Sequence, residues 1–308
     1  MAILVVSPGR DPKVWVRELR NQLPDEEVHS WNEDLKIDKE TVDFAVSWKH
    51  PFGLYKDFPN LKVISSMGAG VDHITGDPEI SRDILITRIV DEQLTIDMSA
   101  FVLALIMSYL KNISNHHCNN TWEPKKYLRI EDAHVGILGL GTLGGGLAKL
   151  LLKNDFKVAG WSNSEKQIEG VSTFHGKDQL PEFLKSVNIL VCLLPLTPET
   201  EGILNNDLFK KLPKGAYVIN VARGEHLVEE DLLEMVQNGH LSGASLDVFR
   251  KEPLPEDHPF WKEPKIMITP HIASITDPRM VVPQVADNYR RLQKGLELKN
   301  VVPPEKGY

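Results

Sequence analysis

The chain has little cysteine and no excess of positive charge. Cys118 and Cys192 are the only cysteines in 308 residues, which argues against a disulfide framework; Cys192 lies in an apolar run, where a thiol usually packs in the core. Asp and Glu total 43 against 35 Lys and Arg, a formal net charge of -8, and no block of basic residues occurs. We therefore expect a small-molecule partner rather than a nucleic acid.

Long apolar segments are also missing. The first residues, "MAILVVSPGRD", are apolar over too few positions for the hydrophobic region of a signal peptide. No continuous apolar run approaches the roughly 18 residues that a membrane-spanning helix needs. We therefore expect a soluble, cytoplasmic protein with no membrane partner.

What the chain does contain is a regular alternation of short β-rich segments and amphipathic helical segments. The first β-rich segments are 2–8, 43–48 and 61–68, with a helical pattern over 13–23. An almost entirely apolar helical pattern follows over 95–112. A second series has six β-rich segments, 134–140, 156–161, 188–194, 216–221, 243–249 and 266–270, separated by four helical ones. Such alternation predicts parallel sheets.

The second series is a complete nucleotide-binding unit, but it is too short to account for the whole chain. The fold class that we predict is α/β, with two Rossmann-like domains, one flavodoxin-like and one dinucleotide-binding, each a doubly wound parallel sheet, and with a cleft between them. The dinucleotide-binding domain spans 99–273 and is inserted into a discontinuous substrate-binding domain, 1–98 plus 274–308. A helix over 278–295 closes the chain, and Pro283 inside it predicts a kink or a late start.

Gly139, Gly141 and Gly144 form a G-x-G-x-x-G motif between a predicted strand and a predicted helix. In dinucleotide binding these glycines permit a tight turn, close approach of the backbone to the pyrophosphate, and close packing of helix on strand. The helix N-terminus then faces the phosphate. Packing alone also produces glycine-rich turns, but the complete series of strands downstream favours a bound cofactor.

The acidic residue that usually ends the second strand of such a domain, and that binds the ribose hydroxyls of NAD, is absent. The sequence there is "WSNSEK", in which Asn163 and Ser164 can donate hydrogen bonds and Lys166 can reach a phosphate. Glu165 can point to solvent. A solvated turn would explain the same residues. The absent acid favours NADP(H) over NAD(H).

Three chemically active side chains follow predicted strands. Arg223, Glu252 and His271 come after the fourth, fifth and sixth strands of the second series. Each alone is more often a surface or structural group, but the carboxyl ends of parallel strands share one edge of the sheet. Arg can orient a 2-oxo acid and polarise its carbonyl, His can supply the proton, and Glu can keep the imidazole protonated. This hydride-transfer chemistry needs no metal ion.

The chain resembles the D-isomer-specific 2-hydroxyacid dehydrogenases, and is most similar to their glyoxylate/hydroxypyruvate reductase A branch. The resemblance rests on "GAGVDHI" at 68–74, "GILGLGTLG" at 136–144, "LLPLTPETEGIL" at 193–204, "INVARGEHLVEEDLL" at 219–233, "GASLDVFRKEPLP" at 243–255 and "ITPHIAS" at 268–274. The "WS" after the second strand and the terminal "KGY" also match that branch. The resemblance implies an NAD(P)-dependent oxidoreductase that converts a small 2-oxo acid to the D-2-hydroxy acid.

The resemblance also implies a set of site residues and a homodimer. Arg223, Glu252 and His271 are the implied catalytic residues, and the implied substrate-binding residues are Trp48, Met67, Gly68, Ala69 and Gly70. The implied cofactor-binding residues are Gly139, Gly141, Thr142, Leu143, Gly144, Ser162, Asn163, Ser164, Lys166, Leu194, Pro195, Thr200, Val221, Ala222, Asp247 and Ala273. Asp247 matches the residue that accepts a hydrogen bond from the nicotinamide carboxamide.

Several alternatives stay open. The reductase A branch tends to place Arg where this chain has Asn163, so its NADP preference transfers only in part. Formate dehydrogenases of the family pair the catalytic His with Gln, so Glu252 argues against that activity. An NAD(H)-sensing corepressor on the same fold is the alternative from another functional class. Adjacent His and Cys in "NHHC", 115–118, cannot converge on one metal ion without distant partners.

Overall fold

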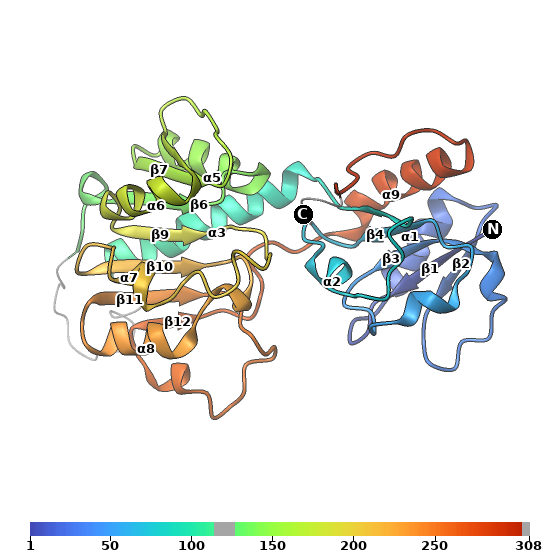
Figure 1. Cartoon of the computed structure of the whole chain (residues 1–308), viewed down its shortest axis with the longest axis horizontal. Helices are drawn as coiled ribbons and strands as arrows, with labels where there is room; N and C mark the ends of the chain where they lie inside the picture. The colour runs from blue at the N-terminus through green and yellow to red at the C-terminus, as the bar shows by residue number, and fades with distance from the viewer. Residues whose placement is uncertain (114–126, 304–308) are drawn as a thin grey trace. The chain divides into compact units, whose positions relative to one another are not determined.

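The computed structural model describes residues 1–113 and 127–303, and this part of the chain forms two compact units (Figure 1). Unit 1 comprises Met1–Asp91 and Thr276–Tyr308, and unit 2 comprises Glu92–Ile275. Each unit has its own parallel β-sheet with helices. The predicted α/β class with two parallel sheets is therefore confirmed.

Unit 2 contains a seven-stranded sheet of order β12-β11-β10-β9-β6-β7-β8, in which all neighbouring strands are parallel. The order reverses between β6 and β9, as in a dinucleotide-binding fold. Its strands are β6 (His134–Leu138), β7 (Lys157–Ser162), β8 (Ser172–His175), β9 (Ile189–Cys192), β10 (Ala216–Asn220), β11 (Leu241–Leu246) and β12 (Ile266–Ile268). Its helices are α3 (Glu92–Lys111), α5 (Thr142–Lys153), α6 (Gly176–Lys185), α7 (Asn206–Phe209) and α8 (Glu229–Gln237).

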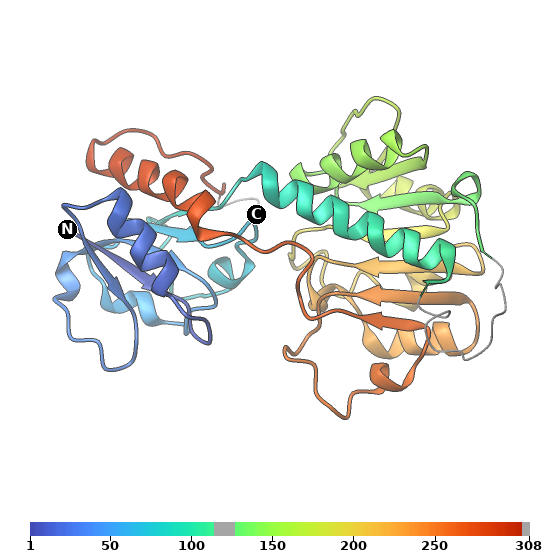
Figure 2. The same ribbon diagram turned by 180° about the vertical axis from the view of Figure 1, so that it is seen from behind.

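Both faces of this sheet are covered, because alternate residues of each strand feed two separate cores. In β9, Leu190 and Cys192 pack with residues of α6, α7 and α8, whereas Ile189 and Val191 pack with residues of α3 and α5. Figure 2 shows α3 crossing the face opposite the one that carries α7 and α8 in Figure 1. Burial raises the pKa of the Cys192 thiol to about 12, so this cysteine is an inert core side chain, as the sequence predicts.

Helix α3 departs from the sequence expectation about apolar segments. By length and composition it is long and apolar enough to cross a membrane, although scattered polar residues keep it from being a continuous apolar run. A core helix of a soluble protein passes the same test. Val102 and Ile106 of α3 are fully buried in the core shared with α5. One side of the helix therefore packs within unit 2, and 39% of its apolar window is buried there.

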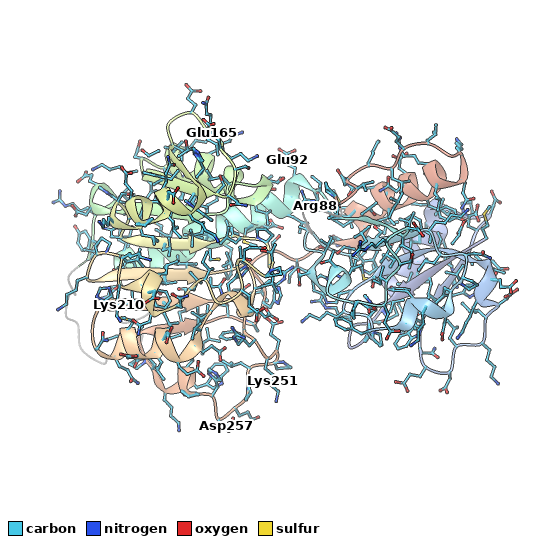
Figure 3. The ribbon with its side chains drawn as sticks, viewed as in Figure 1. Arg88, Glu92, Glu165, Lys210, Lys251 and Asp257 are labelled. Carbon is cyan, nitrogen blue, oxygen red and sulfur yellow. The ribbon has the colours of Figure 1, made fainter. Side chains whose placement is uncertain are left out.

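The division between the units falls at the start of α3. The sequence placed this boundary between residues 98 and 99, a position inside α3, and placed the second boundary between 273 and 274. In the structure the chain passes from one unit to the other at 91/92 and 275/276. Arg88 and Glu92, which lie on either side of the first crossing, are labelled in Figure 3.

Unit 1 contains a five-stranded parallel sheet of order β2-β1-β3-β4-β5, the flavodoxin-like order. Its strands are β1 (Ala2–Val6), β2 (Glu27–Ser30), β3 (Val42–Ser47), β4 (Val63–Ser66) and β5 (Leu85–Thr87), and its helices are α1 (Lys13–Gln22), α2 (Asp72–Thr75) and α9 (Pro278–Gln293). Strand β1 is fully apolar and β3 includes the polar residues Asp43 and Ser47; both strands are buried on both faces, as expected of central parallel strands.

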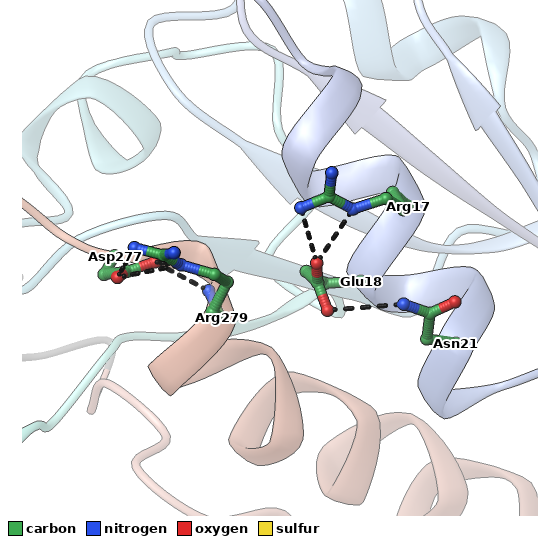
Figure 4. A network of polar contacts seen from close by, with 5 residues as sticks. All are labelled: Arg17, Glu18, Asn21, Asp277 and Arg279. Carbon is green, nitrogen blue, oxygen red and sulfur yellow. Dashed lines mark hydrogen bonds and ion pairs between the residues drawn. The ribbon is translucent and has the colours of Figure 1, made fainter.

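The C-terminal helix α9 belongs to unit 1, where it packs beside α1. Tyr289 of α9 makes an edge-on contact with Phe44 of β3, with ring centroids 5.7 Å apart. Figure 4 shows the polar residues on α1 and at the start of α9. The Asp277 carboxylate raises the pKa of Arg279, with a smaller contribution from Glu18 of α1. Segments at opposite ends of the chain thus complete one domain.

One sequence prediction about elements was wrong, and one of two alternatives for the last helix is excluded. The sequence missed β2, β5 and β8, so it predicted three and six strands where the structure has five and seven. The late start allowed for the last helix is also absent, because α9 begins at Pro278 and continues through Pro283. Asp277 caps this helix by accepting from the Arg279 N–H, and Pro278 occupies the first turn, where a missing N–H costs little.

Candidate functional site

The glycine motif forms the turn between β6 and α5. Gly139 has a φ of 103°, a left-handed conformation that favours glycine, and a side chain there would meet the Leu193 carbonyl oxygen at 2.7 Å. A side chain at Gly144 would collide with the Gly139 carbonyl oxygen. The first glycine therefore permits the turn, and the last permits the helix to begin directly against the strand.

The N-terminus of α5 is suited to an anion. Gly141 is the N-cap residue and no side chain caps this end of the helix. Gly141 and Thr142 are exposed, Leu143 is partly buried, and a side chain at Gly141 would meet nothing within 4 Å. The helix therefore begins with N–H groups that no side chain caps, at the positive end of its dipole, which is the arrangement that binds phosphate.

The end of β7 carries no acidic side chain. Ser162, the last residue of the strand, is buried, and its hydroxyl donates to the Ser164 carbonyl oxygen at 2.7 Å. Asn163, Ser164 and Lys166 are exposed on the following loop, and Glu165 is exposed on the same loop, where Figure 3 labels it. The arrangement therefore offers amide, hydroxyl and ammonium groups where a carboxylate would repel a second phosphate.

The loop after β9 is held together by Thr200. The Thr200 hydroxyl lies 2.7 Å from the Pro195 carbonyl oxygen and accepts from the Thr197 N–H at 2.9 Å. Leu194 is buried and Pro195 is partly exposed. The hydroxyl of Thr200 is therefore used to shape the loop, and a contribution to cofactor binding would come through the backbone that it holds.

Arg223 lies three residues after the end of β10 and follows the buried residues Val221 and Ala222. Its guanidinium donates to the Ala222 carbonyl oxygen at 2.7 Å, and its own carbonyl oxygen accepts from the side-chain amide of Asn220 at 2.9 Å. A side chain at Gly224 would collide with the backbone of Phe249 and Arg250. The loop that carries Arg223 is therefore packed tightly against the loop after β11.

Glu252 and His271 form a close pair. The two carboxylate oxygens of Glu252 lie 3.0 and 2.9 Å from Nδ1 of His271, and both side chains are about a quarter exposed, at 23% and 28%. Glu252 also accepts from the Phe249 N–H at 3.3 Å. Because a carboxylate can only accept here, Nδ1 carries the hydrogen, and Nε2 is the nitrogen through which a proton can be exchanged.

His271 is held in an unfavourable backbone conformation, with a φ of 54°. For a side chain of this size the left-handed region costs on the order of 1 kcal/mol or more. Asp247, fully buried at the end of β11, compensates: its backbone carbonyl accepts from the His271 N–H at 2.8 Å, and its carboxylate accepts from the N–H groups of Ile272 and Ala273 at 3.0 and 2.8 Å. The Thr269 hydroxyl adds a fourth bond at 2.6 Å.

The predicted site residues of unit 2 thus lie on loops, at strand ends or in the first turn of α5, at one edge of its sheet. The loops that carry Arg223, Glu252 and His271 follow β10, β11 and β12, which are neighbours in the sheet. The glycine motif and the Asn163 loop follow β6 and β7 at the same edge. This edge therefore brings an uncapped helix N-terminus and a histidine paired with a carboxylate to the same side of the sheet.

The predicted substrate residues lie in unit 1, at the carboxyl ends of β3 and β4. The Trp48 ring contacts the His73 ring at a tilt of 50°, with ring centroids 4.8 Å apart, and the Arg10 guanidinium lies 4.5 Å above the Trp48 ring. A side chain at Gly68 would meet the Trp48 ring at 3.2 Å. The indole therefore packs directly on the glycine segment Met67–Gly70.

The four backbone amides of that segment are not equivalent. The Met67 N–H donates to the Ser47 carbonyl oxygen at 3.0 Å, and the Gly68 N–H donates to the Ser66 hydroxyl at 3.2 Å. Within the described residues, the N–H groups of Ala69 and Gly70 make no hydrogen bond, and both residues are partly exposed. Of the four predicted amides, these two are free to bind a carboxylate.

Comparison with known proteins gives a consistent result. A family model for "D-isomer specific 2-hydroxyacid dehydrogenase, NAD binding domain" matches residues 100–273. The chain is 37% identical to the glyoxylate/hydroxypyruvate reductase A of Photorhabdus laumondii over an alignment of 316 residues that covers 100% of both proteins. The chain belongs to the D-isomer specific 2-hydroxyacid dehydrogenase family.

Solved structures of other members of this dehydrogenase family have the same fold. A D-isomer specific 2-hydroxyacid dehydrogenase from Xanthobacter autotrophicus Py2, in complex with NADPH and MES, is 37% identical with a TM-score of 0.93, covering 100% of this chain and 99% of that one. The NADPH-dependent glyoxylate/hydroxypyruvate reductase of Sinorhizobium meliloti, in complex with NADP and sulfate, is 36% identical with a TM-score of 0.92 over 100% of both chains. The predicted family is confirmed, and so is the predicted similarity to its glyoxylate/hydroxypyruvate reductase A branch.

One residue of this dehydrogenase site was not predicted from the sequence. His226 is fully buried, and its ring lies between the Arg223 backbone and the Pro195 carbonyl oxygen, at 3.2 Å from each. It stands three residues after Arg223 in "ARGEH", so a search for a second histidine beside the arginine would have found it. Within 1–113 and 127–303, no three His, Cys, Asp or Glu side chains gather as a metal site, and "NHHC" lies outside those residues.

Proposed function

We propose that this dehydrogenase reduces small 2-oxo acids of the glyoxylate or hydroxypyruvate type to D-2-hydroxy acids, with NADPH as the hydride donor. The observation that carries the proposal is the contact of His271 with Glu252, at 2.9 Å, between the loops after β12 and β11, the second of which neighbours the loop that carries Arg223. The relatives are named for this activity, and the related structures contain NADPH or NADP.

The proposed catalytic roles follow from the chemistry of the three side chains. When bound, the nicotinamide cofactor supplies the hydride that forms the new C–H bond at C2. Arg223 binds the substrate with its planar guanidinium, which orients the acid and polarises the carbonyl. Nε2 of His271 gives its proton to the carbonyl oxygen, which becomes the hydroxyl group. Glu252 holds Nδ1–H, so the ring presents Nε2 in one orientation.

The preference for NADPH is supported by the end of β7. A carboxylate at this position would bind the ribose hydroxyls of NADH and repel a 2′-phosphate, and none is present. Asn163 and Ser164 can donate hydrogen bonds to a phosphate, and Lys166 adds a positive charge to the same exposed loop. We assign the 2′-phosphate of NADPH to this loop and the pyrophosphate to the N-terminus of α5.

The two units then have different roles. Unit 2 is proposed as the dinucleotide-binding domain, and unit 1 as the substrate-binding domain, in which Ala69 and Gly70 bind the substrate carboxylate through their N–H groups. Trp48 packs on this segment, and its ring is proposed to form one wall of the substrate site. A cytoplasmic homodimer is part of the same proposal, which rests here on the family resemblance alone.

Spectrophotometric turnover tests the proposal. NADPH oxidation should be observed with glyoxylate or hydroxypyruvate, and His271→Ala should reduce kcat by at least about 100-fold, the usual contribution of a positioned acid, while the Kd for NADPH stays within about twofold. The matched control is His29→Ala, a partly exposed histidine on β2 of unit 1. No turnover with glyoxylate, hydroxypyruvate, pyruvate or phenylpyruvate would instead favour the corepressor alternative.

A further inference from the structure

His226 lies where two loops of the proposed site meet. The loop after β9 presents the Pro195 carbonyl oxygen to Nε2 of His226 at 3.2 Å, and the loop after β10 presents the Arg223 N–H to Nδ1 at 3.2 Å. The ring is fully buried. One side chain therefore joins the segment proposed to line the cofactor to the residue proposed to bind the substrate.

The hydrogen bonds indicate which nitrogen carries the proton. Nδ1 is also 3.2 Å from the Arg223 carbonyl oxygen, but that oxygen already accepts from the Asn220 side chain at 2.9 Å. The neutral ring with hydrogen on Nε2 accepts the Arg223 N–H at Nδ1 and donates to Pro195, so both backbone groups are satisfied. A ring with hydrogen on Nδ1 could not accept the Arg223 N–H, which points at that nitrogen.

The backbone around His226 is fixed independently of its ring. The His226 carbonyl oxygen accepts from the Leu204 N–H at 2.9 Å, and the Val228 N–H donates back to Leu204 at 3.0 Å. The Arg250 guanidinium donates to the carbonyl oxygens of Leu227 and Glu225, at 3.0 and 3.2 Å. Because these bonds do not involve the imidazole, a changed side chain at 226 can alter the two loop contacts without removing the frame that holds them.

We propose that His226 is a positioning residue that sets the cofactor-lining loop and the Arg223 backbone relative to each other through its two ring nitrogens. The inference rests on the proposed roles of Arg223 and the Pro195 loop. Each ring nitrogen positions one loop. Nε2 holds Pro195 in the loop proposed to line the cofactor, and Nδ1 holds Arg223, which is proposed to bind the substrate. The proposed role of His226 is exercised through these two loops, because its ring is fully buried between them.

Two substitutions separate these contributions. The oxygen of an asparagine side chain can take the place of Nδ1, so His226→Asn keeps the acceptor for Arg223 and loses the donor to Pro195. The nitrogen of a glutamine side chain can take the place of Nε2, so His226→Gln keeps the donor to Pro195 and loses the acceptor. A purely structural histidine would not distinguish the two replacements.

Steady-state kinetics of the full chain with glyoxylate and NADPH measure the split. His226→Asn should raise KM for NADPH by about 5- to 30-fold, the effect of one buried hydrogen bond, with KM for glyoxylate within about twofold. His226→Gln should instead raise KM for glyoxylate by about 5- to 30-fold, with KM for NADPH within about twofold. His240→Asn is the control, because His240 bonds the Phe209 carbonyl oxygen at 2.8 Å on a different part of unit 2; both KM values should stay unchanged.

The outcomes decide between the inference and the function on which it rests. Equal increases in both KM values in the two variants, or no increase in either, would overturn the positioning role. Failure of both variants to fold, judged by thermal melting, would also overturn it, since His226 would then act on stability. Wild-type protein that binds NADPH but turns over no 2-oxo acid would instead overturn the proposed function.

Discussion

Asn163 is the residue on which the cofactor preference depends most directly. It is exposed just past the end of β7, where a carboxylate would face the 2′-phosphate of NADPH. We predict that Asn163→Asp lowers kcat/KM for NADPH by about 10- to 100-fold, because two like charges placed close together repel each other by a few kcal/mol at most when solvent partly screens them. The same variant should leave kcat/KM for NADH unchanged or increase it.

Kinetics with both cofactors check this prediction. Asn21→Asp adds the same charge to an exposed position on α1, in unit 1, and should leave the ratio of the two cofactors unaltered. A variant Asn163→Asp that keeps the full NADPH preference would place the 2′-phosphate elsewhere than on this loop.

At the same scale, the catalytic candidates could be predicted because side-chain chemistry and strand order are both visible in the sequence. The pairing of Glu252 with His271 needs only that their loops follow neighbouring strands. The part played by His226 could not be predicted, because it depends on which backbone groups the ring meets. The hydrogen bond from the Met67 N–H to the Ser47 carbonyl oxygen could not be predicted either, because it depends on the register between β3 and β4.

Among the secondary-structure elements, helix α5 shows why the glycines at 144, 145 and 146 are not interchangeable. A side chain at Gly144 would collide with the Gly139 carbonyl oxygen, and one at Gly146 would collide with Thr95 of α3. At Gly145 the nearest atom would be Cδ1 of Ile168 at 3.9 Å, an ordinary contact. We predict that Gly144→Ala destabilises the protein by about 1–3 kcal/mol and weakens NADPH binding at least about 10-fold.

Gly145→Ala is the matched control in the same turn. Alanine is favoured over glycine within a helix by about 1 kcal/mol, so this variant should melt at the same or a higher temperature than wild type and should bind NADPH normally. Thermal melting and fluorescence titration with NADPH measure both effects. Similar losses in the two variants would mean that the turn tolerates no change at all, rather than that Gly144 alone is needed for close packing.

The strands missed by the sequence analysis share a physical cause. β2, β5 and β8 all lie at sheet edges, and each has only three or four residues. An edge strand has one neighbour and is partly exposed, so it needs neither a long apolar run nor full β propensity. β8, for example, reads "STFH" and has no buried residue. The central strands, covered on both faces, were found because burial imposes an apolar pattern.

For the whole molecule, the sequence predicted that the last helix packs on the first domain, because the nucleotide-binding sheet is already complete without it. What the sequence could not reveal is a buried polar network that supports the substrate segment of unit 1. His50 and Asp77 are both buried, with Nε2 of His50 3.1 Å from the Asp77 carboxylate, and Nδ1 lies 3.2 Å from the Ser47 hydroxyl. Ser47 and His50 stand on either side of Trp48 in the sequence, so this network holds the segment that carries the proposed substrate residue Trp48.

The pKa shifts in this network predict how stability depends on pH. Burial lowers the pKa of His50, although Asp77 opposes the shift. Burial alone would raise the pKa of Asp77, but N–H groups of Gly53 and Glu79, together with His50, outweigh it and lower the pKa. Because folding favours neutral His50, its contribution is present above its unfolded pKa of about 6.5 and is lost as the pH falls towards the folded value. The contribution of Asp77 persists until the pH falls below about 4.

We therefore predict that the first loss of stability on acidification comes from His50. The melting temperature of the wild type should fall more between pH 7.5 and 5.5 than that of His50→Gln, by about 2–4 °C for each kcal/mol of coupling, because glutamine cannot be protonated. His175→Gln, at an exposed histidine in unit 2, should keep the wild-type dependence. Parallel curves for wild type and His50→Gln would show that protonation of His50 is not coupled to unfolding, and that the acid response arises from other groups.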